Sequence, residues 1–348
     1  AYMAALFAEI GGRAKDYSDR TVTSIFIGGG TPSLLSGEQI GQLMDRIREQ
    51  FAMAQDAEIT MEVNPGTASA EKLRNFYTAG INRLSIGMQS AQAEELKNLG
   101  RIHDFEGFCQ VYREAVEAGF TNINVDIMSG LPGQTLASYR DTLEKVLHLE
   151  PMPQHISAYS LIVEEGTPFA AMAERGELPL PEEETERAMY EETIEVLSKY
   201  GFHRYEISNY ARDGYECRHN VGYWIRRDYL GFGIGAASLI DNVRFQNEKS
   251  LGAYLAHPLE SREEEQTLTV QDRMEETMFL GLRLTRGVSC VDFAEQYGRT
   301  VEEVYGEVIA RNVADGLLTV REDETGRRLT LTGRGLDVSN YVMAQFLF

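Results

Sequence analysis

Residues 22–32 read Val-Thr-Ser-Ile-Phe-Ile-Gly-Gly-Gly-Thr-Pro, and this stretch decides the fold of the chain. Its first six residues are mostly β-branched or aromatic, which is typical of a buried strand. The three glycines at 28–30 leave bare backbone where the strand ends, so a ligand can lie directly against it. A helix signal, Ser36, follows. The stretch therefore indicates a strand that leads into a helix, with either a small-molecule cradle or a tight turn between them.

Strands and helices alternate through the first half of the chain. We expect strands at 22–27, 58–63, 81–88, 121–128 and 155–163, and helices at 38–51, 69–79, 105–118 and 136–149. Such alternation predicts parallel strands joined by crossover helices, in a βα barrel or a doubly wound sheet. We favour the barrel because no GxGxxG motif follows the first strand.

The second half has a different pattern. Residues 168–181 are rich in Pro, Glu and Gly, which indicates a linker or a domain boundary. Further elements are expected as a helix at 182–200, a strand at 202–210, helices at 271–282, 291–297 and 301–315, and a hairpin that pairs 317–320 with 328–331. This order predicts a smaller mixed α/β domain that contains a helical, winged segment.

Composition narrows the possible partners and the compartment. The 348 residues include 54 acidic and 33 basic ones, for a formal net charge of −21, which argues against a nucleic-acid surface. No apolar stretch approaches the length that crosses a bilayer, and no signal peptide opens the chain. The three cysteines, Cys109, Cys217 and Cys290, form no CxxC-type pair, so a reduced, cytoplasmic compartment fits. Because the chain begins inside an amphipathic helix pattern, we expect further residues upstream of Ala1.

Four polar side chains lie at or after the predicted strands: Glu62, Gln89, Arg101 and Asp126. The carboxyl ends of the strands form the mouth of a βα barrel, where a carboxylate can bind an ammonium or hydroxyl group and an Arg can bind a carboxylate. Three of them also have an ordinary alternative: a surface Glu for Glu62, an exposed Arg for Arg101 and a structural ion pair for Asp126. Together with the glycines they favour a site for a zwitterionic nucleoside.

Five segments carry a resemblance to a known family: IFIGGGTPSLL at 25–35, ITMEVNPGT at 59–67, NRLSIGMQS at 82–90, LGRIH at 99–103 and NVDIMSGLPGQT at 124–135. They resemble the S-adenosylmethionine-binding core of the radical SAM family, in the branch of oxygen-independent coproporphyrinogen III oxidase. The resemblance implies that one group of residues lines the methionine end of the cofactor: Gly29, Gly30 and Thr31. It implies that Glu62 and Arg101 hold the amino and carboxylate groups and that Gln89 and Asp126 contact the nucleoside. In this branch Glu62 and Gln89 alternatively contact a second S-adenosylmethionine.

The second half resembles the HemW-type heme chaperones more than the oxidase proper, on YEISNYARDGYECRHNVGYW at 205–224 and LTGRGLDVSNYVMAQFL at 331–347. His219-Asn220 and Tyr223-Trp224 form an HNxxYW motif, which the resemblance links to heme. Imidazole is an axial ligand of heme iron, and aromatic rings can cover a porphyrin face. The alternative for His219 is a hydrogen-bonded histidine of the core or of a domain interface.

One departure from the family concerns its iron–sulfur cluster. The family holds a [4Fe–4S] cluster on a CxxxCxxC motif after the first barrel strand, and this sequence has no such motif. We therefore expect the cluster ligands, with the first strand, upstream of Ala1. The predicted fold is an incomplete (β/α)6 TIM-like barrel over residues 1–168, followed by a HemW/HemN-type C-terminal domain over 169–348.

The resemblance implies a radical SAM protein that binds S-adenosylmethionine and heme and delivers heme to acceptor proteins. The alternative is an enzyme, an oxygen-independent coproporphyrinogen III oxidase that decarboxylates propionate side chains through a 5′-deoxyadenosyl radical. A third reading is a cluster-free barrel that binds a nucleoside. Expected partners are heme or porphyrin, a heme-acceptor protein and an electron donor for the cluster. Nucleic acid is not expected, and any membrane contact is expected to be peripheral.

Overall fold

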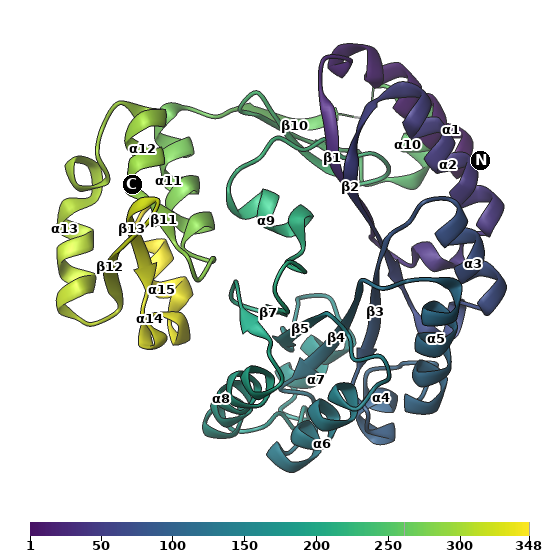
Figure 1. The fold of residues 1–348 in the computed structure, drawn as a ribbon, viewed down its shortest axis with the longest axis horizontal. Helices are drawn as coiled ribbons and strands as arrows, with labels where there is room; N and C mark the ends of the chain where they lie inside the picture. The colour runs from purple at the N-terminus through teal and green to yellow at the C-terminus, as the bar shows by residue number, and fades with distance from the viewer. Residues whose placement is uncertain (261, 348) are drawn as a thin grey trace.

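A curved seven-stranded sheet forms the centre of the first two thirds of the chain (Figure 1). The computed structural model describes residues 1–260 and 262–347. The strand order is β1 (Thr21–Ile27), β2 (Ala52–Val63), β3 (Arg83–Gln89), β4 (Ile123–Ser129), β5 (His155–Ser160), β7 (Asn209–Ala211) and β6 (His203–Arg204). Neighbours from β1 to β5 are parallel, whereas β7 is antiparallel to both β5 and β6. The incomplete barrel is confirmed, but its last two strands are short and antiparallel.

Helices between the strands cover the outer side of the sheet (Figure 1). They are α1 (Tyr2–Arg13), α2 (Gly37–Gln50), α3 (Ala70–Thr78), α4 (Ala93–Asn98), α5 (Phe105–Ala118), α6 (Leu136–Leu147) and α8 (Glu183–Lys199), with short 3-10 helices at Ala14–Tyr17, Pro32–Leu34 and Pro65–Thr67. The sequence sets their starts, because Ser36 and Thr135 each form a capping box at the first turn of α2 and α6. The four helices predicted in this half are all present.

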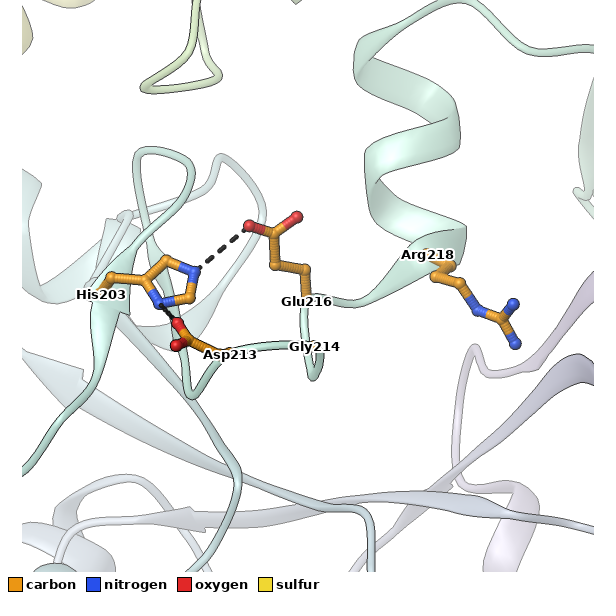
Figure 2. Close-up of a pocket in the computed structure, with 5 residues that line it drawn as sticks. All are labelled: His203, Asp213, Gly214, Glu216 and Arg218. Carbon is orange, nitrogen blue, oxygen red and sulfur yellow. Dashed lines mark hydrogen bonds and ion pairs between the residues drawn. The ribbon is translucent and has the colours of Figure 1, made fainter.

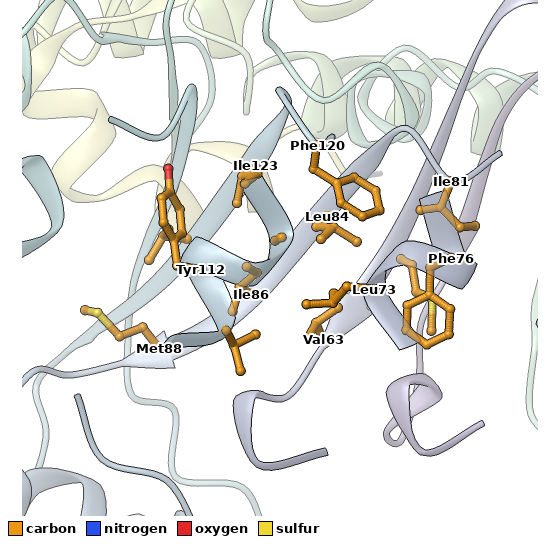
Figure 3. Close-up of a cluster of buried hydrophobic side chains, with 14 of the residues drawn as sticks. Val63, Leu73, Phe76, Ile81, Leu84, Ile86, Met88, Tyr112, Phe120 and Ile123 are labelled. Carbon is orange, nitrogen blue, oxygen red and sulfur yellow. The ribbon is translucent and has the colours of Figure 1, made fainter. Parts of the chain in front are cut away.

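Alternation along the strands gives the sheet an apolar outer face and a polar inner face. On β3, Leu84, Ile86 and Met88 are fully buried in the core against the outer helices (Figure 3). The intervening Arg83 and Ser85 face inward, where register places polar residues of neighbouring strands beside them. The inner face thus includes Ser24, Glu58, Thr60, Glu62, Arg83, Ser85, Asn124, Asp126, His155 and Ser157. A polar inner face is what a ligand-binding barrel requires.

The segment predicted as a linker contains a helix, α7 (Pro168–Glu174). Thr167 accepts a hydrogen bond from the backbone N–H of Ala170, and Pro168 occupies the first turn, so local capping starts this helix inside a segment that is otherwise rich in Pro, Glu and Gly. The strand predicted at 155–163 ends earlier, at Ser160.

The C-terminal part contains two small sheets and a separate apolar core. One sheet is β8 (Ala237–Ile240), β9 (Val243–Asn247) and β10 (Arg262–Thr267), and the other is β11 (Val288–Ser289), β13 (Gly326–Leu331) and β12 (Leu318–Asp323). The helices are α10 (Leu251–Ala256), α11 (Val270–Gly281), α12 (Cys290–Tyr297), α13 (Val301–Ala314), α14 (Gly333–Asp337) and α15 (Ser339–Ala344). The predicted helices and the hairpin of β12 with β13 are confirmed. No helix within residues 1–260 and 262–347 has the length and apolarity that would let it cross a membrane.

One helix, α9 (Arg218–Trp224), lies on the open, inner side of the curved sheet (Figure 1). It contacts β1 of the sheet and α11 of the C-terminal part. It carries the HNxxYW motif, so the fold brings that motif to the inner face.

Candidate functional site

The glycine segment after β1 forms an open seat beside Glu62. The backbone N–H of Gly29 donates a hydrogen bond to Glu62 Oε2 over 3.1 Å. Gly29 and Gly30 have φ angles of 81° and 66°, and a Cβ added to either would meet no atom within 4 Å. Both positions therefore combine a conformation that favours glycine with free space in front of the backbone. Thr31 follows, half-buried, directly before the short helix that ends the seat.

Two carboxylates occupy this end of the inner face. Burial raises the pKa of Glu62, and the nearby charge of Asp126 raises it further. Burial also raises the pKa of Asp126, while hydrogen bonds from Asn124, Ser157 and Ser85 oppose that shift. Asn124 Nδ2 donates to Asp126 Oδ1 over 2.7 Å. The two acids are close enough to influence each other, and both can accept hydrogen bonds from a ligand.

Gln89 ends β3 in a left-handed conformation, with a φ of 69° that is uncommon outside glycine. Its Oε1 accepts a hydrogen bond of 3.0 Å from the Tyr159 hydroxyl. Burial raises the pKa of Tyr159, and the charges of Asp126, Arg101 and Glu62 all act on it as well. Tyr159 therefore lies among all four polar residues predicted for the nucleoside site.

Arg101 is half-buried and follows α4 in a tight turn, in which its backbone N–H bonds to the Leu96 carbonyl over 2.9 Å. Its charge lowers the pKa of His103 and opposes the rise at Tyr159. The structure thus brings together Gly29, Gly30, Thr31, Glu62, Gln89, Arg101 and Asp126 at the carboxyl ends of β1 to β4.

His219 projects from α9 toward β1, and both of its ring nitrogens are hydrogen-bonded. Nδ1 lies 3.0 Å from Ser24 Oγ, and Nε2 lies 2.9 Å from the hydroxyl of Tyr223. Its ring lies 5.3 Å from the ring of Phe26, between centroids. Burial lowers its pKa to about 4, so the imidazole is neutral at pH 7.

The other motif residues also belong to α9. Asn220 is half-buried in its first turn. Trp224 stacks with Arg283, whose guanidinium carbon lies 4.3 Å from the indole centroid. The indole N–H of Trp224 is buried without a hydrogen-bond partner among the residues that the structure describes. Of the four motif residues, His219 contacts β1 of the barrel, whereas Trp224 contacts Arg283 in the C-terminal part.

Glu58 fixes the start of α9 against the sheet. Its two carboxylate oxygens accept hydrogen bonds of 3.0 Å from the backbone N–H groups of Arg218 and His219. Cys217 Sγ lies 3.6 Å from the same carboxylate, and burial raises the pKa of this thiol to about 11. Cys217 is therefore a buried, protonated thiol and not a nucleophile.

Arg83 is a cation of the inner face that the sequence analysis did not single out. Its side chain is almost fully buried, and its Nε and Nη2 have no hydrogen-bond partner within the described part of the chain. Thr60, its neighbour in register on β2, also has an unpartnered hydroxyl there. Burial raises the pKa values of Asp126 and Cys217, and the charge of Arg83 opposes both rises, so Arg83 partly compensates these two buried acids.

The end of α9 is tied to the C-terminal part by Glu276 of α11. Arg226 Nε and Arg244 Nη1 lie 2.7 and 2.8 Å from its two carboxylate oxygens. Glu276 and Arg226 are both almost fully buried, so this cluster is a fixed joint.

The seat and His219 face the same interior. Phe26 is their common neighbour, since a Cβ on Gly28 would lie 2.9 Å from the Phe26 ring and 3.0 Å from Glu62 Cδ. The Phe26 ring also lies beside the imidazole of His219, with 5.3 Å between the ring centroids. A ligand in the seat and one at α9 would therefore be near neighbours.

A surface pocket lies beside the start of α9 (Figure 2). His203 contacts two carboxylates there, with Nδ1 3.3 Å from Asp213 and Nε2 3.2 Å from Glu216. Arg218, also at the pocket, pairs with Asp56 over 2.8 Å. These exposed contacts join the loop at 212–218 to the sheet and include none of the predicted site residues.

The open seat fits a nucleoside cofactor, but the described residues do not fit an iron–sulfur cluster. Cys109, Cys217 and Cys290 lie on different elements, and burial raises the pKa of all three thiols. Among residues 1–260 and 262–347, no group of three or more His, Cys, Asp or Glu side chains could hold a metal ion.

Comparisons with known proteins identify the family of the chain. Residues 4–146 match the Radical SAM superfamily model, and residues 268–338 match the HemN C-terminal domain. The heme chaperone HemW of Bacillus subtilis is 39% identical over 331 residues, which cover 93% of this chain and 85% of that protein. The heme chaperone HemW of Escherichia coli is 37% identical over 308 residues, covering 86% and 78% of the two chains.

Among solved structures, the coproporphyrinogen III oxidase HemN of Escherichia coli, described as a radical SAM enzyme, superposes with a TM-score of 0.84. It is 26% identical, and the match covers 99% of this chain and 82% of that one. Radical SAM membership implies S-adenosylmethionine and a [4Fe–4S] cluster as cofactors. The chain therefore belongs to the radical SAM superfamily and, within it, is closely related to the HemW heme chaperones.

Proposed function

We propose that this chain binds S-adenosylmethionine in the seat after β1 and heme at α9, and that it delivers heme to an acceptor protein in the cytoplasm. The observation that carries the proposal is the position of Phe26, which neighbours both Glu62 of the seat and His219 of the HNxxYW motif. The heme chaperones among its relatives support the heme part.

In this proposal the strand ends bind the cofactor by charge and shape. The amino group and the carboxylate of its methionine part pair with Glu62 and Arg101, respectively. Its methionine part also lies against Gly29, Gly30 and Thr31, where the backbone is open. Gln89 and Asp126 accept hydrogen bonds from the nucleoside.

In radical SAM proteins an external donor reduces the cluster, and the cluster supplies that electron to S-adenosylmethionine. Because the described residues do not fit the cluster, the proposal assigns this chain no cleavage of the cofactor. The division at residue 168 remains our proposed domain boundary, and any membrane contact of the proposed carrier is peripheral.

Two titrations test the proposal. Hemin is added to the purified chain and followed by its absorption spectrum, and S-adenosylhomocysteine is titrated by calorimetry. We expect His219→Ala to change the heme spectrum and weaken heme binding. Asp126→Ala should weaken nucleoside binding by about 1–3 kcal/mol, the cost of an unsatisfied buried partner. Unchanged heme spectra in His219→Ala would remove the axial-ligand assignment.

The alternative is oxygen-independent oxidation of coproporphyrinogen III. The superposition on HemN over 99% of this chain favours it. The two functions are distinguished with the protein extended by its expected upstream segment and loaded with iron and sulfide, which is incubated with coproporphyrinogen III and a reductant under argon. Stoichiometric heme uptake without a porphyrin product supports the carrier, whereas multiple turnovers support the oxidase.

A further inference from the structure

A continuous chain of buried hydrogen bonds joins the start of α9 to Asp126. At the α9 end, the backbone N–H of Cys217 donates to the Tyr205 hydroxyl over 3.2 Å. The same hydroxyl lies 2.8 Å from Nε2 of His155. Tyr205 and His155 are 4% and 0% exposed, so water does not compete for these bonds.

The chain continues across the inner face of the sheet. Nδ1 of His155 lies 2.6 Å from Oδ1 of Asn124, and Nδ2 of Asn124 donates to Asp126 over 2.7 Å. Register places Asn124 directly beside His155, and Asn124 is also buried. Four hydrogen bonds thus connect α9, which carries His219, to the carboxylate proposed to bind the nucleoside.

The donors and acceptors allow only one direction along this chain. Burial keeps the pKa of His155 well below its usual range, so its ring is neutral and one nitrogen carries the proton. Asn124 presents its amide N–H to the Asp126 carboxylate, which leaves its carbonyl oxygen as an acceptor toward His155. The proton of His155 must therefore be on Nδ1, and Nε2 must accept from the Tyr205 hydroxyl.

The Tyr205 hydroxyl supports this tautomer, because a donor at Nε2 favours the proton on Nδ1, and a protonated Nδ1 in turn favours the observed amide orientation of Asn124. Without that hydroxyl, Nε2 loses its donor, and the Nδ1-protonated tautomer and the Asn124 orientation lose that part of their stabilisation. A flipped Asn124 amide would direct its oxygen at Asp126, which places two acceptors in contact. The orientation of the Asp126 carboxylate therefore depends on Tyr205, which is three hydrogen bonds away.

We propose that Tyr205 is a positioning residue that orients Asp126 for its ligand and links that ligand to the position of α9. The inference rests on the proposed role of Asp126 in nucleoside binding. The same hydroxyl accepts from the backbone N–H of Cys217, so Tyr205 contacts both the start of α9 and the bonds that lead to Asp126.

The experiment compares Tyr205→Phe with a matched control, Tyr139→Phe. Tyr139 is also buried, and its hydroxyl bonds to Thr193, which is not part of this chain of bonds. S-adenosylhomocysteine is titrated by calorimetry. We expect Tyr205→Phe to weaken binding roughly 5- to 30-fold and Tyr139→Phe to bind like the parent.

A parent-like affinity in Tyr205→Phe overturns the inference. Failure of the parent chain itself to bind S-adenosylhomocysteine overturns the proposed function instead. Nitrogen NMR of the parent protein provides a measurement that needs no variant, because it reports the tautomer of His155. A proton on Nε2 rather than Nδ1 contradicts the direction of the chain and removes the role of Tyr205.

Discussion

Removal of the Tyr223 hydroxyl should tighten heme binding, although Tyr223 belongs to the heme motif. In the structure this hydroxyl lies 2.9 Å from Nε2 of His219, so coordination through Nε2 must first break that bond. One such bond contributes about 0.5–1.5 kcal/mol net. Tyr223→Phe removes this cost and keeps the aromatic ring, which predicts about 2- to 12-fold tighter binding.

The partner on the other ring nitrogen has the opposite effect. Ser24 lies 3.0 Å from Nδ1 and orients the imidazole of His219 from the barrel wall. Partners of this kind strengthen metal coordination by histidine, so Ser24→Ala should weaken heme binding.

The assay is a hemin titration followed by absorbance, with Tyr112→Phe as the control. Tyr112 is a buried tyrosine whose hydroxyl bonds to a backbone carbonyl over 2.7 Å on the outer side of the sheet. Its variant should bind heme like the parent. Weaker heme binding in Tyr223→Phe would refute the reasoning, since it would make the hydroxyl a contact of the heme rather than a competitor for His219.

Two further predictions concern the seat and the pH dependence. Gly30→Ala and Gly298→Ala change residues of equal φ, 66°, with no atom near the new Cβ, so each should lower stability by about 1–2 kcal/mol in urea unfolding. Only Gly30→Ala should weaken S-adenosylhomocysteine binding in calorimetry, and equal binding in both variants would remove Gly30 from the seat. The pKa of His219 is about 4 in the folded chain and about 6.5 in the unfolded chain. As the pH falls from about 6.5 to about 4, His219 gains a proton only in the unfolded chain, so the folded state loses stability over this range. Urea midpoints at about pH 7 and about pH 5 should therefore differ less in His219→Gln than in the exposed-site control His257→Gln, and an equal difference contradicts the assigned burial.

Local sequence patterns were sufficient to predict most strands and helices of the barrel. The strands β1 to β5 are short apolar or alternating runs that end in glycine or polar residues, and these signals do not depend on distant contacts. The helix at Pro168–Glu174 was missed because its Thr-Pro start lies within a stretch whose composition resembles a linker. A capping signal at Thr167 was present and could have identified it.

The candidate site was less predictable, because tertiary contacts assemble it. Tyr159 contacts Gln89 only after the barrel curves, and its signal was its place two residues beyond Ser157 on the same face. His155 was not singled out from the sequence, yet it has a specific partner on each ring nitrogen. Arg83 falls near the start of the strand predicted at 81–88, and nothing local indicated that its charge would be buried.

The joint at Glu276 has a mechanical consequence. Its carboxylate grips Arg226 just beyond α9 and Arg244 on β9, and Trp224 at the end of α9 stacks on Arg283 beyond α11. These three contacts couple the end of α9 to α11. A protein that docks on the C-terminal helices and moves them would therefore also strain the contact of His219 with Ser24 at the other end of α9.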